Sequence, residues 1–408
     1  MEKRNFFQKF INAIGIKVKE SSLFRIYNGF SPTFSAYNQK ISDNDVILAC
    51  INTIATHCAK FEPLHYQNDT NIKGDINYLL SNQPNEIMTP YDFIYRTISL
   101  LYLHNNAFVY IDKNDQGMIT GFYPINYTTS DFVKDASGNL YLQFYLLNGQ
   151  QYTLPYDNLI HLRRFYNDND LLGSSNSVLN SAIQNQMTAE EGIGIAIKTS
   201  NAFKGIYQVN QNLKEDDIKR NQKNFVEAFI NENNSGIATV DAKGEFKPIN
   251  LKPITLDKDQ LQHVNQRILD YFTMNTSILS GKFTSEEWNS FYESVLEPLS
   301  IYLSQSFKIK IFSKKAIKNG HTIRFLVNRV KYASPDQKIK MVKEISPIGL
   351  ITVDQALTIL DLPPIGGEEG AKRMQSLNYI NSKIADAYQL GKIIGDTKGD
   401  NEDEQKEK

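Results

Sequence analysis

The chain has 408 residues, of which 41% are hydrophobic and 11% aromatic, so it is long enough for two or three structural parts and argues against general disorder. Its 44 Lys and Arg residues are balanced by 45 Asp and Glu residues, which gives a formal net charge of −1. Because a free nucleic-acid-binding protein usually carries a basic surplus, any contact with DNA must be local. The sequence contains no signal-peptide core and no run of eighteen apolar residues, so we expect an intracellular protein without a membrane span.

Two amphipathic helices are predicted near the start of the chain, after an extended arm of about forty residues. The first helix begins at a possible capping box over residues 42–45, and its apolar residues recur at spacings of four, three and four: Ile47, Ile51, Ile54 and Cys58. The second helix begins at Thr89 and Pro90, with Asp92 completing the cap, and extends to about Leu103.

Between residues 107 and 164 the apolar period changes to two, which is typical of strands, and Asn148-Gly149 is a tight-hairpin signal. A sheet flanked by helices predicts an α+β fold. Further along, the pattern predicts helices over 178–204, 214–231, 256–279, 284–303, 334–346 and 368–390, a short capped helix from Thr352, and strands over 236–250, 309–312 and 322–330. The charged tail over 396–408 is predicted to be disordered.

The sequence offers few groups for catalysis. It has no phosphate-binding glycine loop and no histidine pair spaced for a metal ion, and a lone histidine such as His161 in a strand is typical of a packed residue. Cys50 and Cys58 lie eight residues apart in one predicted helix, about 12 Å of rise, so we expect reduced thiols and no disulfide. We therefore predict that the chain is not an enzyme and needs no metal or other cofactor.

The strongest local signal is electrostatic. Residues 304–343 contain eleven basic residues and one acidic residue, Asp336, in a chain whose net charge is −1. These basic residues fall on predicted turns, short strands and a helix start, and not in the charged tail. The segment indicates either a lysine-rich face in contact with solvent or a surface for a partner.

A break in the helical pattern follows the basic segment. Pro347 disfavours a helical conformation at Ser346, and Gly349 allows unusual backbone angles. The break separates the helix predicted over 334–346 from the short helix that begins at Thr352. The pattern is consistent with a loop presented to a partner and with an ordinary connection between two helices.

Seven segments, taken in order, together carry a resemblance to a known family: residues 46–55, 79–93, 105–111, 160–175, 268–281, 296–299 and 349–367. They resemble the portal proteins (head–tail connectors) of tailed double-stranded DNA phages, of the siphophage type. The chain departs from that pattern at Asn105, where the family prefers a glycine, and near Ser175, where it usually has a proline.

The resemblance implies a ring of about twelve copies at one capsid vertex, with double-stranded DNA passing through the central channel. Each subunit of such a ring has a wing, a stem, a clip and a crown. On that pattern we expect an N-terminal arm over 1–40, an α/β wing over 41–255, a stem helix over 256–279, the clip over 280–332, a second stem helix over 333–346, a tunnel loop and helix over 347–367, a crown helix over 368–392 and a disordered tail over 393–408.

The same mapping assigns roles to charged residues. It places the DNA channel and tunnel loop at Ser346, Pro347, Ile348, Gly349, Lys338, Lys340 and Lys343. It places partner docking on the clip, at Lys308, Lys310, Lys314, Lys315, Lys318, Arg324 and Arg329. Each neutralised phosphate steepens the salt dependence of DNA binding by roughly 0.9 in log–log slope, so a ring that used all these cations would immobilise the duplex. We therefore expect most of them to contact proteins or solvent.

The resemblance also implies the partners: other copies of the chain, non-specific double-stranded DNA, the terminase large subunit, a head–tail adaptor protein, and the major capsid and scaffold proteins. It implies a location in the virion, at a capsid vertex, and in the host cytoplasm during assembly, without a membrane. Two alternatives remain. A nucleic-acid-processing enzyme or its accessory subunit requires clustered carboxylates for a metal ion, which the sequence does not reveal. A generic scaffold or adaptor protein explains the polar helices but not the basic segment.

Overall fold

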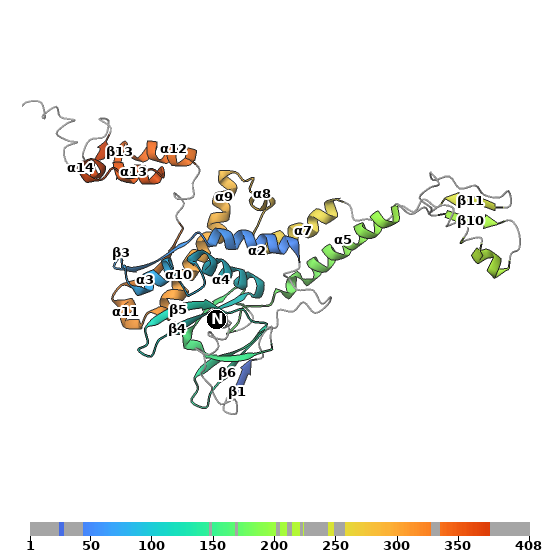
Figure 1. Ribbon diagram of the computed structural model, residues 1–408, viewed down its shortest axis with the longest axis horizontal. Helices are drawn as coiled ribbons and strands as arrows, with labels where there is room; N and C mark the ends of the chain where they lie inside the picture. Colours follow the sequence, from blue (N-terminus) through green and yellow to red (C-terminus); the bar gives the residue numbers. More distant parts are fainter. Residues whose placement is uncertain are drawn as a thin grey trace, which may run out of the picture. The chain divides into compact units, whose positions relative to one another are not determined.

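The computed structural model describes residues 24–27, 44–146, 149–167, 170–200, 205–209, 214–220, 223, 244–248, 258–327 and 335–375 (Figure 1). The chain divides into two compact units, Met1–Leu326 and Val327–Lys408, which are described separately below. Within the described residues, no helix has the length and apolar character that crossing a membrane requires.

Helices α2 (Asp45–Cys58) and α4 (Pro90–His104) pack against each other in the first unit. The capping box predicted for α4 is confirmed, because the Thr89 hydroxyl accepts from Asp92 N and the Asp92 carboxylate accepts from Thr89 N. The cap of α2 is Asn44, whose side chain accepts from Ile47 N, so the helix begins at Asp45 and is not capped by the box expected over residues 42–45.

A three-stranded antiparallel sheet with the order β5-β4-β9 lies under α4. Its strands are β4 (Asn106–Lys113), β5 (Ile119–Pro124) and β9 (Leu159–Arg163). The first six residues of β4 are buried, which is the pattern of a central strand covered on both faces. The alternation of apolar residues in the sequence therefore predicted the strands correctly. Alternation usually indicates one exposed face, but the central strand β4 is buried on both faces.

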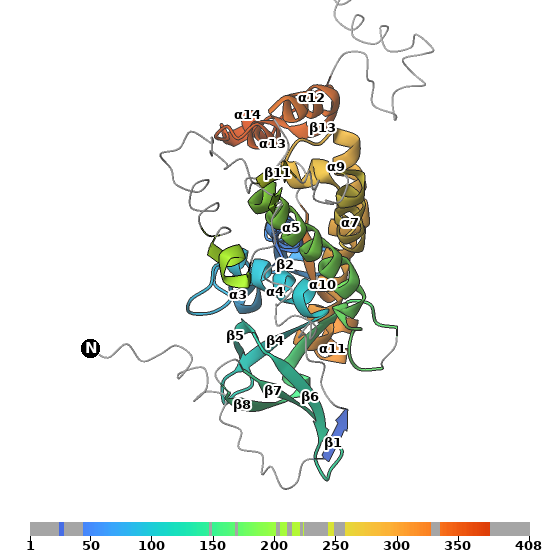
Figure 2. The same ribbon diagram turned by 90° about the vertical axis from the view of Figure 1, so that its right-hand side faces the viewer.

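A four-stranded antiparallel sheet with the order β1-β6-β7-β8 adjoins the first sheet (Figure 2). It contains β1 (Phe24–Tyr27), β6 (Thr129–Lys134), β7 (Leu140–Tyr145) and β8 (Gln151–Pro155). Part of the expected N-terminal arm is thus a strand, paired with β6. Aromatic and aliphatic side chains from both sheets form one core: Phe108, Tyr127, Phe132, Leu142, Phe144 and Leu159 among them. Asn148 of the expected hairpin lies outside the described residues.

A third sheet, with the order β12-β2-β3, joins residues that are far apart in the sequence. Strand β2 (Glu62–Gln67) pairs with β3 (Thr70–Asn71) and with β12 (His321–Leu326). Helix α3 (Asp75–Ser81) packs on β2, and α10 (Glu297–Ile311) packs on β12. Residues 297–326, which lie in the range expected for a separate clip, therefore pack with β2 in the first unit.

Helix α10 is the last part of a continuous helical stretch. It follows α9 (Ser285–Phe291), which starts with the predicted capping box at Thr284, and a π-helical turn at Tyr292–Leu296. The strand predicted over 309–312 is wrong, because Leu299, Leu303 and Phe307 are buried at helical spacing and carry the helix on to Ile311. The strand predicted over 322–330 is confirmed from 322 to 326.

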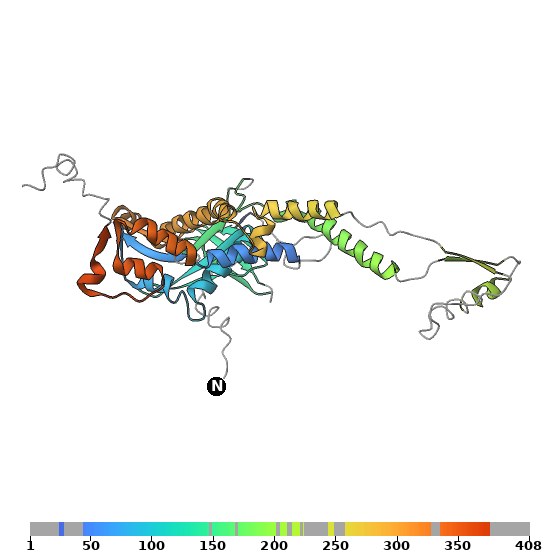
Figure 3. The ribbon, with the colours of Figure 1, turned by 90° about the horizontal axis from the view of Figure 1, so that it is seen from above.

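Two further helices of the first unit, α5 (Asn180–Ser200) and α7 (Lys258–Tyr271), pack side by side, as Figure 3 also shows. The buried residues of α5 include three alanines spaced by seven positions, Ala182, Ala189 and Ala196. Small side chains on one stripe let two helices approach closely. Between the two helices in the sequence, β10 (Gly205–Val209) pairs with β11 (Gly244–Pro248).

A buried polar junction connects α4, β9 and α7. Asn105 follows α4 with a left-handed backbone (φ 54°) and donates from Nδ2 to Ser174 O (2.8 Å) and to Asn176 Oδ1 (2.6 Å). Tyr271 of α7 donates its hydroxyl to Asn176 Oδ1. Arg164 N donates to Asn105 O at 2.8 Å. A positive φ suits glycine best, and asparagine tolerates this conformation better than most other residues.

The second unit is small. It contains α12 (Pro335–Ile345), β13 (Ile348–Thr352), α13 (Val353–Ile359), α14 (Gly367–Ala371) and β14 (Arg373–Gln375), with β13 and β14 antiparallel. The helix predicted over 334–346 and the capping box at Thr352 are confirmed. A continuous helix from residue 368 is wrong, since the chain leaves α14 and enters β14. The rest of that predicted helix and the tail lie outside the described residues.

Two glycines give opposite predictions for replacement by alanine. A Cβ on Gly173 would lie 2.2 Å from Arg164 O and 2.5 Å from Asn105 O, whereas a Cβ on Gly192 in α5 would meet nothing within 4 Å. We expect Gly173→Ala to lower the free energy of unfolding by about 3 kcal/mol, and Gly192→Ala to raise it by about 0.5–1 kcal/mol. Urea denaturation of both variants measures this. Equal midpoints for Gly173→Ala and the parent chain would contradict the close packing at the junction.

Candidate functional surfaces

The buried histidines have structural partners. His161 on β9 contacts Asn106 Oδ1 through Nε2 (3.1 Å) and the Tyr156 hydroxyl through Nδ1 (3.2 Å), and its ring stacks on Phe108 at 4.2 Å. Since an amide oxygen only accepts, Nε2 carries the proton and Nδ1 accepts from the tyrosine. Burial lowers the pKa of His161 well below its usual value. The ring is therefore a neutral hydrogen-bonding residue of the core, as its position in a strand predicted.

Two other histidines are also held neutral by their surroundings. The ring of His57 packs against Trp288 at 4.9 Å, and burial, with Lys60 nearby, lowers its pKa to about 4. The ring of His104 packs on Tyr127 at 5.1 Å, and burial lowers its pKa to about 4. A histidine with such a pKa is a poor general acid or base near neutral pH.

The cysteines are buried free thiols. Burial raises the pKa of Cys50 to about 12 and raises that of Cys58 as well, so neither forms a thiolate readily. Among the residues that the structure describes, no cluster of three or more His, Cys, Asp or Glu side chains is arranged to hold a metal ion. These groups offer nothing that resembles an activated nucleophile.

Two of the residues expected to dock partners are bound within the chain. Lys310 on α10 donates to Tyr156 O at 2.8 Å and lies over the Tyr156 ring at 4.4 Å, and burial lowers its pKa. Arg324 on β12 pairs with Asp69 at 2.5 Å and lies over the ring of Tyr66 at 4.8 Å. Both cations contribute to the packing of the first unit, which the count of charges did not reveal.

The remaining docking candidates are more accessible. Lys314, Lys315 and Lys318 are exposed and lie together on α11 (Lys314–Lys318), while Lys308 on α10 is half-buried. Arg329 lies outside the described residues. The three exposed lysines therefore lie together on one short helix, which packs next to β12.

The expected channel residues lie in the second unit. Lys338 is buried on α12 and its ammonium bonds to the Asp361 carboxylate, whereas Lys340 and Lys343 are exposed. The break after α12 is a turn in which Gly349 N donates to Ser346 O at 3.0 Å. Pro347 lies in this turn, and Ile348 and Gly349 (φ 75°) begin β13. The expected tunnel loop is therefore a turn that leads into a paired strand.

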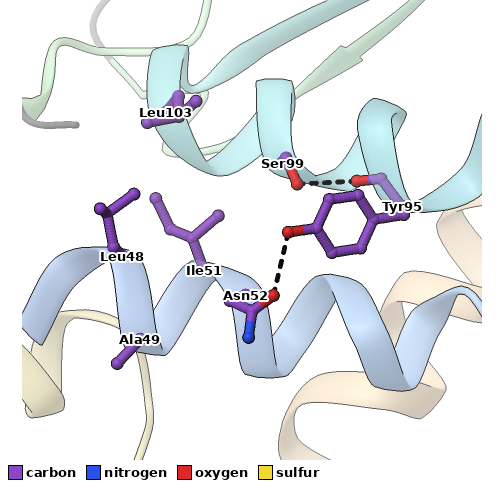
Figure 4. Close-up of a pocket in the computed structure, with 7 residues that line it drawn as sticks. All are labelled: Leu48, Ala49, Ile51, Asn52, Tyr95, Ser99 and Leu103. Carbon is purple, nitrogen blue, oxygen red and sulfur yellow. Dashed lines mark hydrogen bonds between the residues drawn. The ribbon is translucent and has the colours of Figure 1, made fainter. Parts of the chain in front are cut away.

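A groove between α2 and α4 was not foreseen from the sequence. It has a volume of about 510 Å³ and is lined by Leu48, Ala49, Ile51, Asn52, Tyr95, Ser99 and Leu103. Figure 4 shows Tyr95 reaching across it, with its hydroxyl donating to Asn52 Oδ1 at 2.9 Å. The one signal in the sequence is Leu48, an apolar residue that flanks the stripe of Ile47, Ile51, Ile54 and Cys58 on α2. The lining is mostly apolar and holds no charged group, which suits packing better than chemistry.

Comparison with known proteins identifies the family. The chain matches the family model described as "Phage portal protein" over residues 45–361, from α2 to beyond α13 and across both units. The match covers more than half of the chain, which therefore belongs to the phage portal protein family. This confirms the resemblance drawn from the sequence, and it confirms that the chain is a structural protein and not an enzyme.

Individual relatives agree with this family. A "Probable portal protein" of Lactococcus phage p2 is 25% identical over 191 residues, which are 44% of this chain and 50% of that protein. The matched region thus spans about half the length of this curated relative. Among solved structures, a chain in the "Neck of empty GTA particle" has a TM-score of 0.58 at 15% identity, covering 79% of this chain and 92% of that one. A chain in the "Virion of native gene transfer agent (GTA) particle" has a TM-score of 0.57 at 14% identity, with 79% and 91% covered. At these identities the likeness confirms the α+β fold alone.

The depressed histidine pKa values predict a loss of stability in acid. In the unfolded chain His57 and His104 take up protons near pH 6.5, but in the folded chain only near pH 4. Between these values the unfolded state binds more protons, so the free energy of unfolding falls as the pH falls through this window. Urea titrations from pH 7 to pH 5 should show this fall in the free energy of unfolding. In His104→Gln the dependence of that free energy on pH should correspond to the uptake of about one proton fewer on unfolding. His263→Gln, at an exposed position on α7, is the matched control, and an unchanged slope for His104→Gln would contradict the assignment.

Proposed function

We propose that this chain is the ring-forming portal subunit of a tailed phage or a phage-like particle, placed at one capsid vertex as the channel for double-stranded DNA. The family match over residues 45–361 carries the proposal, because it spans both units of the chain. The fold likeness to a chain of a particle neck supports a place in the virion. We propose about twelve copies in the ring, with a terminase, a head–tail adaptor and the capsid and scaffold proteins as partners.

The packing of the helices supports a revised division of the subunit. We propose that α5 and α7 are the two stem helices and that residues 201–257, which contain the β10–β11 pair, are the clip. The side-by-side packing of α5 and α7 along buried alanines supports this, as does the intervening segment with its own strands. The pairing of β12 with β2 favours a wing that also includes residues 285–326. The second unit would then belong to the crown.

This division moves the proposed DNA contact. In the family pattern a tunnel loop follows the second stem helix, so residues 272–284 after α7 become the candidate. This segment turns twice, with positive φ at Thr273 (54°) and at Gly281 (71°), and it contains α8 (Thr276–Ser280). Its one basic residue, Lys282, is exposed. A single cation in each subunit fits the requirement that a channel bind sliding DNA weakly.

The exposed lysines of α11 suit a protein partner. Lys314, Lys315 and Lys318 follow the C-terminal end of α10, whereas Lys282, which we propose to contact DNA, precedes α9 and the N-terminal end of α10. We propose that they bind an acidic surface of a neighbouring protein in the particle. The near-zero net charge of the chain supports this division of roles, because the excess of basic over acidic residues is concentrated in residues 304–343.

The ring is testable on the purified chain. We expect native mass spectrometry and negative-stain imaging to show closed annular assemblies at high protein concentration, because a head-to-tail contact that closes on itself yields a ring. Rings of more than one size are compatible with the proposal, since the particle itself selects the number. A chain that stays strictly monomeric across the concentration range would contradict the proposal that it forms a ring.

The channel assignment is tested by reversing one charge in each candidate segment. In a packaging reaction with the cognate motor, Lys282→Glu rings should package less DNA, on the order of tenfold, because a ring of negative charge would repel the duplex. Lys343→Glu tests the segment favoured by the sequence. Lys73→Glu, at an exposed position to which no DNA or partner contact is assigned, is the matched control. Intact rings for all three variants, with a defect in Lys343→Glu alone, would return the channel to residues 346–349 and overturn our assignment.

A further inference from the structure

Two histidines that are 256 positions apart in the sequence share a hydrogen bond in the first unit. His65 on β2 and His321 on β12 belong to the third sheet, and His65 Nε2 lies 3.0 Å from His321 Nδ1. The ring of Phe312, at the end of α10, packs on both imidazoles, with its centroid 4.9 Å from that of His65 and 5.5 Å from that of His321. His65 is buried and His321 is half-buried, so solvent reaches the pair from the side of His321.

The distance between the two nitrogens leaves room for one proton. In a neutral pair one ring donates its N–H and the other accepts, and one added proton gives an imidazolium that donates to a neutral ring. If both rings are protonated, two N–H groups face each other and the hydrogen bond is lost. The protonation of each ring therefore depends on the other. Burial, with His321 nearby, lowers the pKa of His65, so the folded chain disfavours a positive charge on this ring.

The charged groups around the pair do not offset a second positive charge. On the two strands themselves, Glu62 and Arg324 lie an odd number of positions from His65 and His321, so their side chains face the other side of the sheet. Arg324 pairs there with Asp69. Strand β3 carries no charge, and the helices that pack on β2 and β12 carry mostly lysines: Asp75 on α3, Glu297, Lys308 and Lys310 on α10, and Lys314, Lys315 and Lys318 on α11.

The pair lies at the less constrained end of β12. At the other end of this strand, Phe325 is buried and its backbone N–H donates to Ser304 Oγ at 2.9 Å, so α10 holds that end. Close to His321, the bond from Asn68 N to Gly320 O is longer, at 3.3 Å. Strand β12 is also at the edge of its sheet, where local opening costs less than in the core.

We propose that His65 and His321 form a proton-operated latch of the third sheet. With one added proton or none, their hydrogen bond holds the start of β12 on β2, and protonation of both rings breaks this bond and opens residues 319–323 before the rest of the sheet. Helix α11 leads into this segment, since Asn319 N donates to Lys315 O, so opening also changes how the exposed lysines of α11 are presented. The proposal concerns the chain itself and does not rest on the ring.

Hydrogen exchange of the full-length chain at pH 7 and pH 5 tests the latch, once the rates are corrected for the direct effect of pH on amide exchange. A histidine in the open state takes up a proton near pH 6.5, whereas the closed pair accepts its second proton only at lower pH. Opening therefore takes up a proton, and the opening constant at the start of β12 should rise by more than about tenfold between pH 7 and pH 5. Strand β4 is the internal reference for global unfolding. A constant value for β12, or an equal rise in β4, overturns the proposal.

Two substitutions at position 321 separate the pair from the burial of His65 alone. His321→Lys keeps a donor with a permanent positive charge beside His65, and His321→Gln keeps a hydrogen-bonding side chain without a charge. The rise in the opening constant between pH 7 and pH 5 should be more than about tenfold in the Lys variant and only about a few-fold in the Gln variant. His263→Gln, at an exposed position on α7, is the matched control and should keep the rise of the parent chain. Equal rises in the Lys and Gln variants would show that His65 titrates alone, and no latch would then exist.

Discussion

The first unit depends on the buried junction at which Asn105 ends α4. Its left-handed backbone turns the chain from the helix into β4, and its side chain bonds to Asn176, which also accepts from Tyr271 of α7. Arg164, over the ring of Tyr102 at 3.8 Å, closes the same network. In an apolar surrounding each unpaired polar group is costly, so these bonds determine where α7 meets the sheets. The proposed stem is thereby attached to the wing at a defined angle and place.

Local signals in the sequence predicted local structure well. The capping boxes at Thr89, Thr284 and Thr352 are all present, because each depends on residues three positions apart. The strand predicted over 309–312 failed because alternation of Lys and Ile over four residues cannot compete with the packing of Leu303 and Phe307 one turn earlier. The pairing of β2 with β12 had no local signal, and the extent of the wing depends on it.

The charged residues illustrate a different limit. A count of cations over residues 304–343 was correct, but the partners of those cations are set by the fold. Lys310, Arg324 and Lys338 each bind an oxygen of their own chain, from Tyr156, Asp69 and Asp361. Buried Lys338 and half-buried Lys310 cost more to remove from their partners than an exposed charge, so they are poorly suited to transient contacts, whereas the Arg324–Asp69 pair lies at the surface. Sequence reasoning therefore anticipated a positive segment but not which of its members remain accessible.

The pairing of β2 with β12 also bears on how the chain folds. Strand β2 (residues 62–67) pairs with β12 (residues 321–326), so the third sheet cannot form until most of the chain has left the ribosome. Contacts of such high sequence separation slow folding and leave a strand edge open in the meantime. An open edge can pair with other chains, so partly folded forms are prone to aggregate at high protein concentration. The chain is therefore expected to fold slowly, with the third sheet among its last parts to form.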